Sequence, residues 1–291
     1  MKAAPFHYHA PRSLAEALDL LSRLENARLL GGGQSLMPML NFRIAAPDHL
    51  VDLGRIPELV GLEDGESRIS IGAMTTQRSV ERSAIVRENC PLLAEAVDHI
   101  GHQQTRNRGT IGGSLCHLDP GAELPVAALA LDAELTVLGP SGARSLAFRD
   151  FPTGYLSVAL GADEILTRIA FPKRRQREAG VFLEFNQRPA DFAIVSAAVR
   201  LAFDDIGRVE RIAIAIGGVQ SAPVRLKDAE DFLRGQFLQP RSFEAAADAA
   251  SRVDCEGDDL YPSDYRRELC GVLVRRALKK AAGRAGDQAY A

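Results

Sequence analysis

Two glycine-rich stretches are the parts of this chain best suited to chemistry. The first, GGGQS, occupies residues 31–35, and the second, GTIGGS, occupies residues 109–114. Consecutive glycines let backbone N–H groups converge on an anion without obstruction by side chains. Further polar groups come from Gln34, Ser35, Thr110 and Ser114. Two such stretches predict a clamp for a diphosphate, although both are also compatible with plain turns and strand corners.

Two acidic residues extend this chemistry toward a nucleotide. Asp119 and Glu123 follow the second stretch, and their carboxylates accept hydrogen bonds from sugar hydroxyls. The usual nucleotide motifs are absent: the triple glycine lacks G-x-G-x-x-G spacing, Pro38 and Pro47 interrupt the helix that would follow, and neither stretch contains a P-loop lysine. There is also no G-x-S-x-G elbow and no histidine–carboxylate spacing typical of hydrolases, so we expect no catalytic side chain.

Composition places the chain among ordinary globular proteins. Its 291 residues fit one to three domains, and 46% of them are hydrophobic. The net charge of −3, from 35 basic and 38 acidic residues, gives no reason to expect nucleic acid or anionic lipid as a partner. No apolar run approaches the roughly 18 residues of a membrane span, and the N-terminal sequence lacks a signal core, so we expect a cytoplasmic protein.

The cysteines and histidines lack metal-ligand spacing. The four cysteines, at positions 90, 116, 255 and 270, form no C-x-x-C pair, and we expect buried free thiols. The pairs His7/His9 and His99/His102 have no cysteine or carboxylate at ligand spacing. We therefore expect neither a metal ion nor an iron–sulfur cluster in this chain.

Hydrophobic periodicity predicts a mixed α+β chain rather than a regular βαβ array. Ser13 and Glu16 form a capping box before an apolar stripe, and Pro91 stands where a helix begins. Residues 107–125 are expected to be irregular because they contain four glycines and two prolines. Further helices are predicted at 76–83, 125–131 and 224–233 and from Ser263, and strands at 27–30, 49–53, 68–71, 134–138, 164–171, 181–185, 192–203 and 209–216.

In their full context the glycine-rich stretches resemble the FAD-binding medium subunits of the molybdenum hydroxylases, the family of the carbon monoxide dehydrogenase medium subunit and the xanthine dehydrogenase FAD domain. The resemblance begins with GGGQSLMPMLNFR, HLVDL and TRNRGTIGGSLCHLDPGAELP. It continues in order through DEILTRIAFP (163–172), FLEFNQRPADFAIVSAAV (182–199), IGGVQSAPVR (216–225) and SDYRRELCGVLVRRAL (263–278). These motifs cover nearly the whole chain.

The resemblance implies the two-subdomain FAD-binding fold of the vanillyl-alcohol oxidase type, followed by a C-terminal α+β domain. FAD-binding subdomain 1 would comprise residues 1–56 and subdomain 2 residues 57–174. The C-terminal domain would comprise residues 178–291. The boundary falls at PKRRQRE, residues 172–178, whose proline and basic run are typical of an exposed linker rather than of a nucleic-acid site.

Motif positions imply the cofactor-binding residues. The first stretch with Leu36 and the second stretch would contact the FAD pyrophosphate from opposite sides, and His117 and Asp119 would continue that wall. Glu123 stands where many relatives have an Asp that bonds the ribityl or ribose region, and Leu166 matches a leucine beside the adenine or ring system. The residues expected to bind FAD are Gly31, Gly32, Gly33, Gln34, Ser35, Leu36, Thr110, Gly113, Ser114, His117, Asp119, Glu123, Leu166 and Asn186.

Two positions depart from the family pattern. Many relatives carry His at the position of Gln34, and relatives often carry Lys at the position of Asn186. A lysine near the ring would stabilise reduced anionic flavin by its charge, which Asn does not. Arg188 is the nearest possible substitute in the sequence, and Phe182 or Phe185 is expected to shield the ring.

The family role is that of an oxidoreductase subunit for electron transfer. A molybdenum cofactor on a large subunit would hydroxylate the substrate with oxygen from water. Electrons would pass through two [2Fe–2S] clusters of a small subunit to FAD on this chain and then to an external acceptor. The three subunits would form a heterotrimer, typically doubled. A self-contained FAD oxidoreductase of the same fold is the alternative, although no covalent-flavin histidine and no substrate lid are evident; a non-enzymatic assembly factor or nucleotide-binding module is the third possibility.

Overall fold

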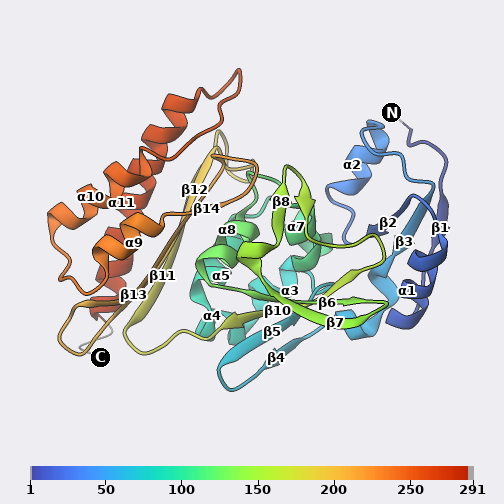
Figure 1. Ribbon diagram of the computed structural model, residues 1–291, viewed down its shortest axis with the longest axis horizontal. Helices are drawn as coiled ribbons and strands as arrows, with labels where there is room; N and C mark the ends of the chain where they lie inside the picture. Colours follow the sequence, from blue (N-terminus) through green and yellow to red (C-terminus); the bar gives the residue numbers. More distant parts are fainter. Residues whose placement is uncertain (1, 288–291) are drawn as a thin grey trace.

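The computed structural model describes residues 2–287, so the ends of the first and last expected domain ranges, Met1 and residues 288–291, lie outside the described part. Figure 1 shows three β-sheets in succession, with the N-terminal sheet at one end and the C-terminal sheet at the other. The predicted mixed α+β class is confirmed. Among the described residues, no helix is long and apolar enough to cross a membrane.

The N-terminal part holds a small parallel sheet of order β1-β3-β2. Its α1 helix begins as predicted, because the Ser13 hydroxyl accepts a hydrogen bond from the Glu16 N–H at 3.2 Å. Ala17 and Leu21 of this helix are buried with the sheet. The elements are β1 (His7–His9), α1 (Leu14–Arg23), β2 (Ala27–Leu30), α2 (Leu36–Asn41) and β3 (His49–Asp52).

The middle part is a five-stranded antiparallel sheet of order β4-β5-β10-β6-β7, covered by short helices. A small hairpin, β8 (Pro152–Gly154) and β9 (Ser157–Val158), lies beside it. The strands are β4 (Leu62–Asp64), β5 (Arg68–Gly72), β6 (Glu134–Gly139), β7 (Gly142–Ala147) and β10 (Ile165–Pro172). The helices are α3 (Gln77–Arg82), α4 (Ala84–Asn89), α5 (Pro91–His99), α6 (Gln103–Arg108), α7 (Ile111–His117) and α8 (Glu123–Ala130).

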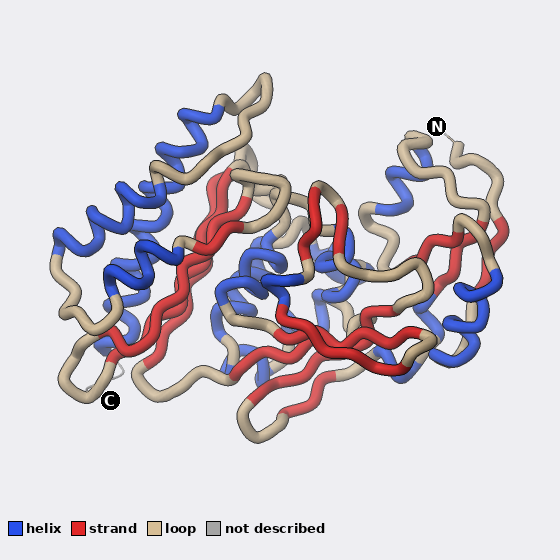
Figure 2. Tube along the Cα trace, viewed as in Figure 1, coloured by secondary structure: helices blue, strands red, loops and turns tan. Residues whose placement is uncertain are grey.

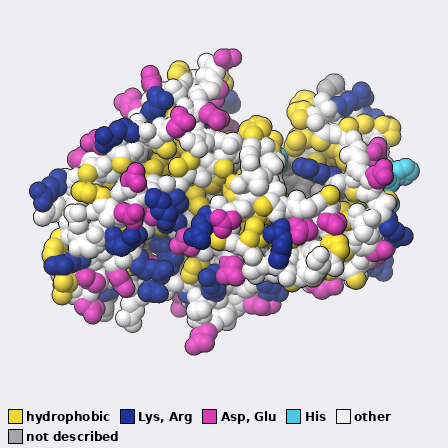
Figure 3. All heavy atoms as spheres, viewed as in Figure 1, with side chains coloured by type: hydrophobic (Ala, Val, Ile, Leu, Met, Phe, Trp, Pro, Cys, Tyr) yellow, Lys and Arg dark blue, Asp and Glu magenta, His cyan; other side chains and the backbone are white. Residues whose placement is uncertain are grey.

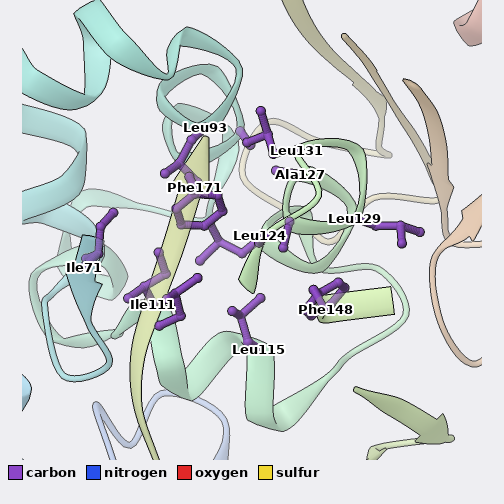
Figure 4. Close-up of a cluster of buried hydrophobic side chains, with 14 of the residues drawn as sticks. Ile71, Leu93, Ile111, Leu115, Leu124, Ala127, Leu129, Leu131, Phe148 and Phe171 are labelled. Atoms are coloured by element: carbon purple, nitrogen blue, oxygen red, sulfur yellow. The ribbon is translucent and has the colours of Figure 1, made fainter. Parts of the chain in front are cut away.

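The core of the middle part gathers around α8. All eight residues of this helix are buried, which fits a helix that is apolar on every side. Figure 4 shows Leu124 and Ala127 of α8 in one cluster with Ile111 and Leu115 of α7 and with Phe171 of β10. This packing fixes α7 and α8, which carry much of the second glycine-rich stretch and the acidic residues after it.

The C-terminal sheet, of order β11-β12-β13-β14, is covered on both faces (Figure 2). Phe182, Ala198 and Ala215 lie in register and join the core of α5 and α8. Their neighbours Val181 and Val199 join the separate core of α11. The elements are β11 (Glu178–Phe185), β12 (Val195–Phe203), β13 (Val209–Gly217), β14 (Val224–Arg225), α9 (Lys227–Leu233), α10 (Pro240–Ala250) and α11 (Ser263–Asp287).

Several local predictions were wrong. Residues 107–125 are not irregular, since α6 ends within them and α7 and α8 begin there. The helix predicted from residue 224 begins at Lys227, because Val224 and Arg225 pair with β13 as a short strand. Periodicity also missed α2, α4, α6 and α10, and it started β12 three residues early. Pro38 did not prevent a helix after the triple glycine, since it lies in the first turn of α2, where a missing N–H is tolerated.

Candidate functional site

One large cavity brings together nearly all of the residues that were predicted to bind FAD. Its volume is about 660 Å³, within the range of roughly 300–1,000 Å³ usual for ligand sites. On the face drawn in Figure 3, the surface is notched between the part around the N-terminus and the middle of the molecule. All the predicted binding residues line the cavity except Asn186.

The first glycine-rich stretch connects β2 to α2 and leaves its donors unpaired. In the part of the chain that the structure describes, the backbone N–H groups of residues 32–35 have no protein acceptor. Gly33 adopts a left-handed conformation with φ 73°, which glycine tolerates best. Ser35 makes no capping bond with its hydroxyl. Since buried or half-buried N–H groups normally find partners, this stretch is suited to an anionic ligand.

The second stretch forms the start of α7 and uses most of its donors inside the protein. The N–H groups of Ile111 and Gly112 donate to the carbonyls of Thr75 at 3.1 Å and Ala73 at 2.8 Å. The Gly113 N–H donates to the Thr110 hydroxyl oxygen at 3.0 Å, which caps the helix. What this stretch offers to a ligand is therefore chiefly the hydroxyl protons of Thr110 and Ser114.

The two stretches touch through their glycines. A Cβ atom on Gly32 would lie 2.0 Å from the Arg108 carbonyl oxygen and 2.7 Å from the Gly109 Cα. A Cβ on Gly31 would lie 3.2 Å from the Thr110 hydroxyl oxygen. The glycine at position 32 is therefore required by the approach of the other loop, whether or not a ligand is present.

The end of α7 and the residues after it supply further polar groups to the cavity wall. Burial lowers the pKa of His117, against the opposing effect of the Asp119 carboxylate, so the imidazole is neutral at pH 7. Burial also raises the pKa of the neighbouring Cys116 thiol to about 12, which keeps it protonated. Asp119 accepts a hydrogen bond from the Gly121 N–H at 2.9 Å. Leu118 closes the helix in the left-handed conformation with φ 51°.

Glu123 and Leu166 complete this side of the cavity. Glu123 is the first residue of α8 and is only 5% exposed, and burial raises its pKa to about 8. Leu166 lies on β10, where the pairing with β6 shifts register between Leu166 and Arg168. The structure thus places an uncharged acid and an aliphatic side chain along the same cavity.

Asn186 lies outside the cavity lining. Its side-chain amide donates to Glu184 at 2.9 Å, and Arg188, the possible lysine substitute, lies 3.6 Å from Asp191 and is largely exposed. Phe182 is buried against His99. Phe185 is half-exposed and does not line the cavity. The aromatic residue of this segment that reaches the cavity lining is Phe192, together with Ala190 and Asp191.

Several lining residues were not predicted. Arg28, on β2, adds a cation to the wall, and its place three residues before the triple glycine was an available signal. Gln77 gave no signal in the sequence; its side-chain oxygen is buried without a hydrogen-bond partner. Met74 and Thr105 also line the cavity; Met74 is remote in sequence from both glycine-rich stretches, whereas Thr105 lies just before the second. Among the described residues, no group of three or more histidines, cysteines or acids is arranged to hold a metal ion.

Comparison with known proteins agrees with this geometry. Residues 4–174 match the family model for the FAD binding domain in molybdopterin dehydrogenase, and residues 181–281 match that for the CO dehydrogenase flavoprotein C-terminal domain. The nicotine 6-hydroxylase medium subunit of Paenarthrobacter nicotinovorans is 36% identical over 98% of this chain and 100% of its own length. The carbon monoxide dehydrogenase medium chain of Hydrogenophaga pseudoflava is 37% identical over 95% of this chain and 96% of its own length.

Solved structures show the same fold. The chain is similar to one in carbon monoxide dehydrogenase from Hydrogenophaga pseudoflava lacking the Mo-pyranopterin moiety, with a TM-score of 0.95, 38% identity and coverage of 98% of this chain and 99% of that one. It is also similar to one in quinoline 2-oxidoreductase from Pseudomonas putida 86, with a TM-score of 0.93, 35% identity and coverage of 98% and 99%. The predicted fold, cofactor and oxidoreductase class are confirmed. The chain belongs to the family of FAD-binding flavoprotein subunits of the molybdopterin dehydrogenases.

Proposed function

We propose that this chain is the electron-transfer subunit of a molybdenum hydroxylase complex and that its FAD lies in the cavity described above. The observation that carries the proposal is the row of unpaired N–H groups at residues 32–35, in one cavity with the hydroxyls of Thr110 and Ser114. A diphosphate requires such donors, and Arg28 adds a cation to the same wall. The proposal is supported further because this chain is similar, over nearly its whole length, to the medium subunits of nicotine 6-hydroxylase and carbon monoxide dehydrogenase.

The residues of the cavity have separate tasks in this proposal. The N–H groups of residues 32–35 and the Ser35 hydroxyl bind one side of the pyrophosphate. Thr110 already accepts a bond from Gly113, so its own hydroxyl proton is available for the other side. Neutral His117 contributes a polar contact without a charge, and Leu166 packs against an apolar part of the cofactor. Bound FAD supplies the redox chemistry, which the side chains of the cavity do not.

Gln34 and Asn186 enter the proposal differently. The Gln34 amide turns back onto its own loop and donates to the Gly32 carbonyl at 3.2 Å. It therefore stabilises the shape of the loop and contacts FAD only after rotation. Asn186 holds the buried carboxylate of Glu184, so we assign it a positioning role behind the cavity rather than a direct contact.

The proposed partners are a large subunit with the molybdenum cofactor and a small subunit with two [2Fe–2S] clusters, assembled as a doubled heterotrimer. Substrate hydroxylation takes place on the large subunit, and electrons pass through the clusters to FAD and then to an external acceptor. The clusters are assigned to the small subunit because the cysteines of this chain form no C-x-x-C pair and, among the described residues, no three potential ligands gather at one place.

The test is purification of this chain, tagged, from cells that produce the whole complex. We expect a yellow-brown assembly with two partner subunits, one FAD per copy of this chain, and molybdenum and iron in a ratio of about 1:4, which is what one cofactor and two [2Fe–2S] clusters give. The isolated chain is expected to bind FAD but to oxidise no N-heterocycle, aldehyde, purine or carbon monoxide. Turnover by the isolated chain would instead favour a self-contained oxidoreductase.

A further inference from the structure

Glu123 lies at the wall of the FAD cavity, and a second buried carboxyl group, that of Glu184, acts on it electrostatically. Glu123 begins α8, lines the cavity and is 5% exposed. The side chain of Glu184, on β11, is 3% exposed, and its negative charge raises the pKa of Glu123. Two carboxylates in one low-dielectric region repel each other, so the proton is retained by whichever carboxyl has the poorer partners.

Glu184 has more hydrogen-bond partners than Glu123. One of its oxygens lies 3.2 Å from the His99 Nδ1 atom and accepts a hydrogen bond from the Asn186 amide at 2.9 Å. This bond to Glu184 raises the pKa of His99, with further contributions from Glu95 and Asp98. Its other oxygen is buried without a partner. A histidine and an amide thus stabilise the Glu184 carboxylate.

Glu123 has no cation of its own. Among the described residues, no side chain donates a hydrogen bond to its carboxyl, and the nearest opposite charge that affects it is Arg106. That guanidinium is already bound to Glu81 at 2.8 Å and to the carbonyls of Ile100 and Gly101, each at 2.8 Å. Asp119, on the other side, is a second negative charge. The start of α8 and the Glu123 N–H favour an anion, but burial outweighs them.

We propose that Glu123 meets FAD as an uncharged carboxylic acid and donates its O–H to an acceptor atom of the cofactor. This inference rests on the FAD site proposed above and changes the expected chemistry, in which Glu123 accepts a hydrogen bond from a sugar hydroxyl. An uncharged acid adds no repulsion to the two negative charges of the pyrophosphate. It also makes FAD binding depend on a proton that is lost just above neutral pH.

In the FAD-free site, burial raises the pKa of Glu123 to about 8. Below that pH the acid is intact and FAD affinity is constant. If only the protonated form binds, linkage predicts that the dissociation constant rises about tenfold between pH 7 and pH 9. His117 contributes no change in this window, because burial already lowers its pKa below the ordinary value of 6.5.

The experiment measures FAD affinity of the full-length chain by flavin fluorescence quenching from pH 6.5 to 9. We expect the native chain to lose about tenfold in affinity, and Glu123→Gln, which keeps a hydrogen-bond donor but cannot ionise, to show a flat profile. Glu184→Gln removes the repelling charge, so the Glu123 pKa should fall and FAD binding should be lost at a lower pH than in the native chain. The matched control is Glu244→Gln, an exposed carboxyl of the C-terminal domain paired with Arg275, which should reproduce the native profile.

Infrared difference spectra of the FAD-free chain provide a second readout. Raising the pH from 7 to 9 should remove a protonated-carboxyl C=O band from the native chain and from Glu244→Gln but not from Glu123→Gln. The proposal is overturned if that band is absent, or if Glu123→Gln loses affinity at pH 7 while the native profile is flat. If the native chain binds no FAD at any pH, the proposed FAD site fails, whereas the infrared band still reports on Glu123 alone.

Discussion

The two glycine-rich stretches have similar composition and opposite uses. Within the described part of the chain, residues 32–35 leave their N–H groups without protein acceptors, whereas Gly109 and residues 111–114 donate theirs to other protein groups. The segment around Thr75 holds the second stretch in place. Its carbonyls accept hydrogen bonds from the N–H groups of Ile111 and Gly112, and it donates one N–H to the Gly109 carbonyl. The first stretch is therefore suited to bind an anion, whereas the second is fixed by hydrogen bonds within the protein and presents hydroxyl groups. Glycine content alone does not distinguish these roles.

The largest expected effect comes from Gly32→Leu, which separates the two stretches. Its Cβ would lie 2.0 Å from the Arg108 carbonyl oxygen, a backbone atom that cannot turn aside. We expect FAD affinity to fall by about 100-fold or more, equivalent to about 2.7 kcal/mol. The fold should persist, because residues 31–35 belong to none of the hydrophobic cores. Flavin content and circular dichroism of the purified chain measure both effects.

The control for this variant is Gly283→Ala in α11, where an added Cβ meets no atom within 4 Å. It should keep full flavin content and gain up to about 1 kcal/mol of stability, since alanine favours a helix. Full flavin retention by Gly32→Leu would show that the two stretches do not act as one clamp.

Gly112→Ala tests how much the second stretch stabilises the fold, separately from FAD binding. Its methyl group would lie 2.6 Å from the Ala73 Cβ and 2.7 Å from the Ala73 carbonyl oxygen, so the second stretch would be displaced from the segment around Ala73. We expect the free energy of unfolding to fall by about 1–3 kcal/mol. Urea denaturation of the FAD-free chain measures this loss. Gly31→Ala, whose closest contact would be 3.2 Å, should lose less stability; equal losses would contradict the distinction between the stretches.

Thr110→Val and Ser114→Ala compare two hydroxyls of the second stretch. The Thr110 hydroxyl caps α7, so its removal should cost about 1 kcal/mol of stability in addition to weaker FAD binding. The Ser114 hydroxyl has no such task, and its variant should weaken FAD binding with little change in stability. Thermal unfolding without FAD and titration with FAD separate the two quantities. If both variants bind FAD like the native chain, the hydroxyls do not contact it.

The smallest expected effect is that of Ser35→Ala in the first stretch. Ser35 makes no capping bond with its hydroxyl, so the FAD-free chain should unfold as before. Loss of one hydrogen bond to the pyrophosphate should weaken FAD binding by about 0.5–1.5 kcal/mol. A loss of stability without a change in affinity, seen by the same two measurements, would assign this hydroxyl to the fold and not to the ligand.

Much of the fold was predictable where local signals act alone. The capping of α1 by Ser13 and the start of α5 at Pro91 are decided within one turn of helix, and the sequence shows them directly. The α7 helix was missed because its Gly112 and Gly113 have poor helix propensity. It forms because Ile111 and Leu115 are buried and Thr110 caps it. Val224 and Arg225 were wrongly assigned to a helix for a similar reason. They form a strand because they pair with β13, and local periodicity does not show that pairing.

The sequence by itself determined the family and the cofactor and identified part of the cavity lining, because motifs that recur in a fixed order can be read along the chain. The tertiary structure decided which backbone donors remain unpaired among the described residues, that Phe192 rather than Phe182 or Phe185 lines the cavity, and that Asn186 bonds to Glu184 outside the lining. It also decided the burial of Glu123. Each of these depends on what remote segments place beside a group, since hydrogen bonding and desolvation are set by spatial neighbours and not by sequence neighbours.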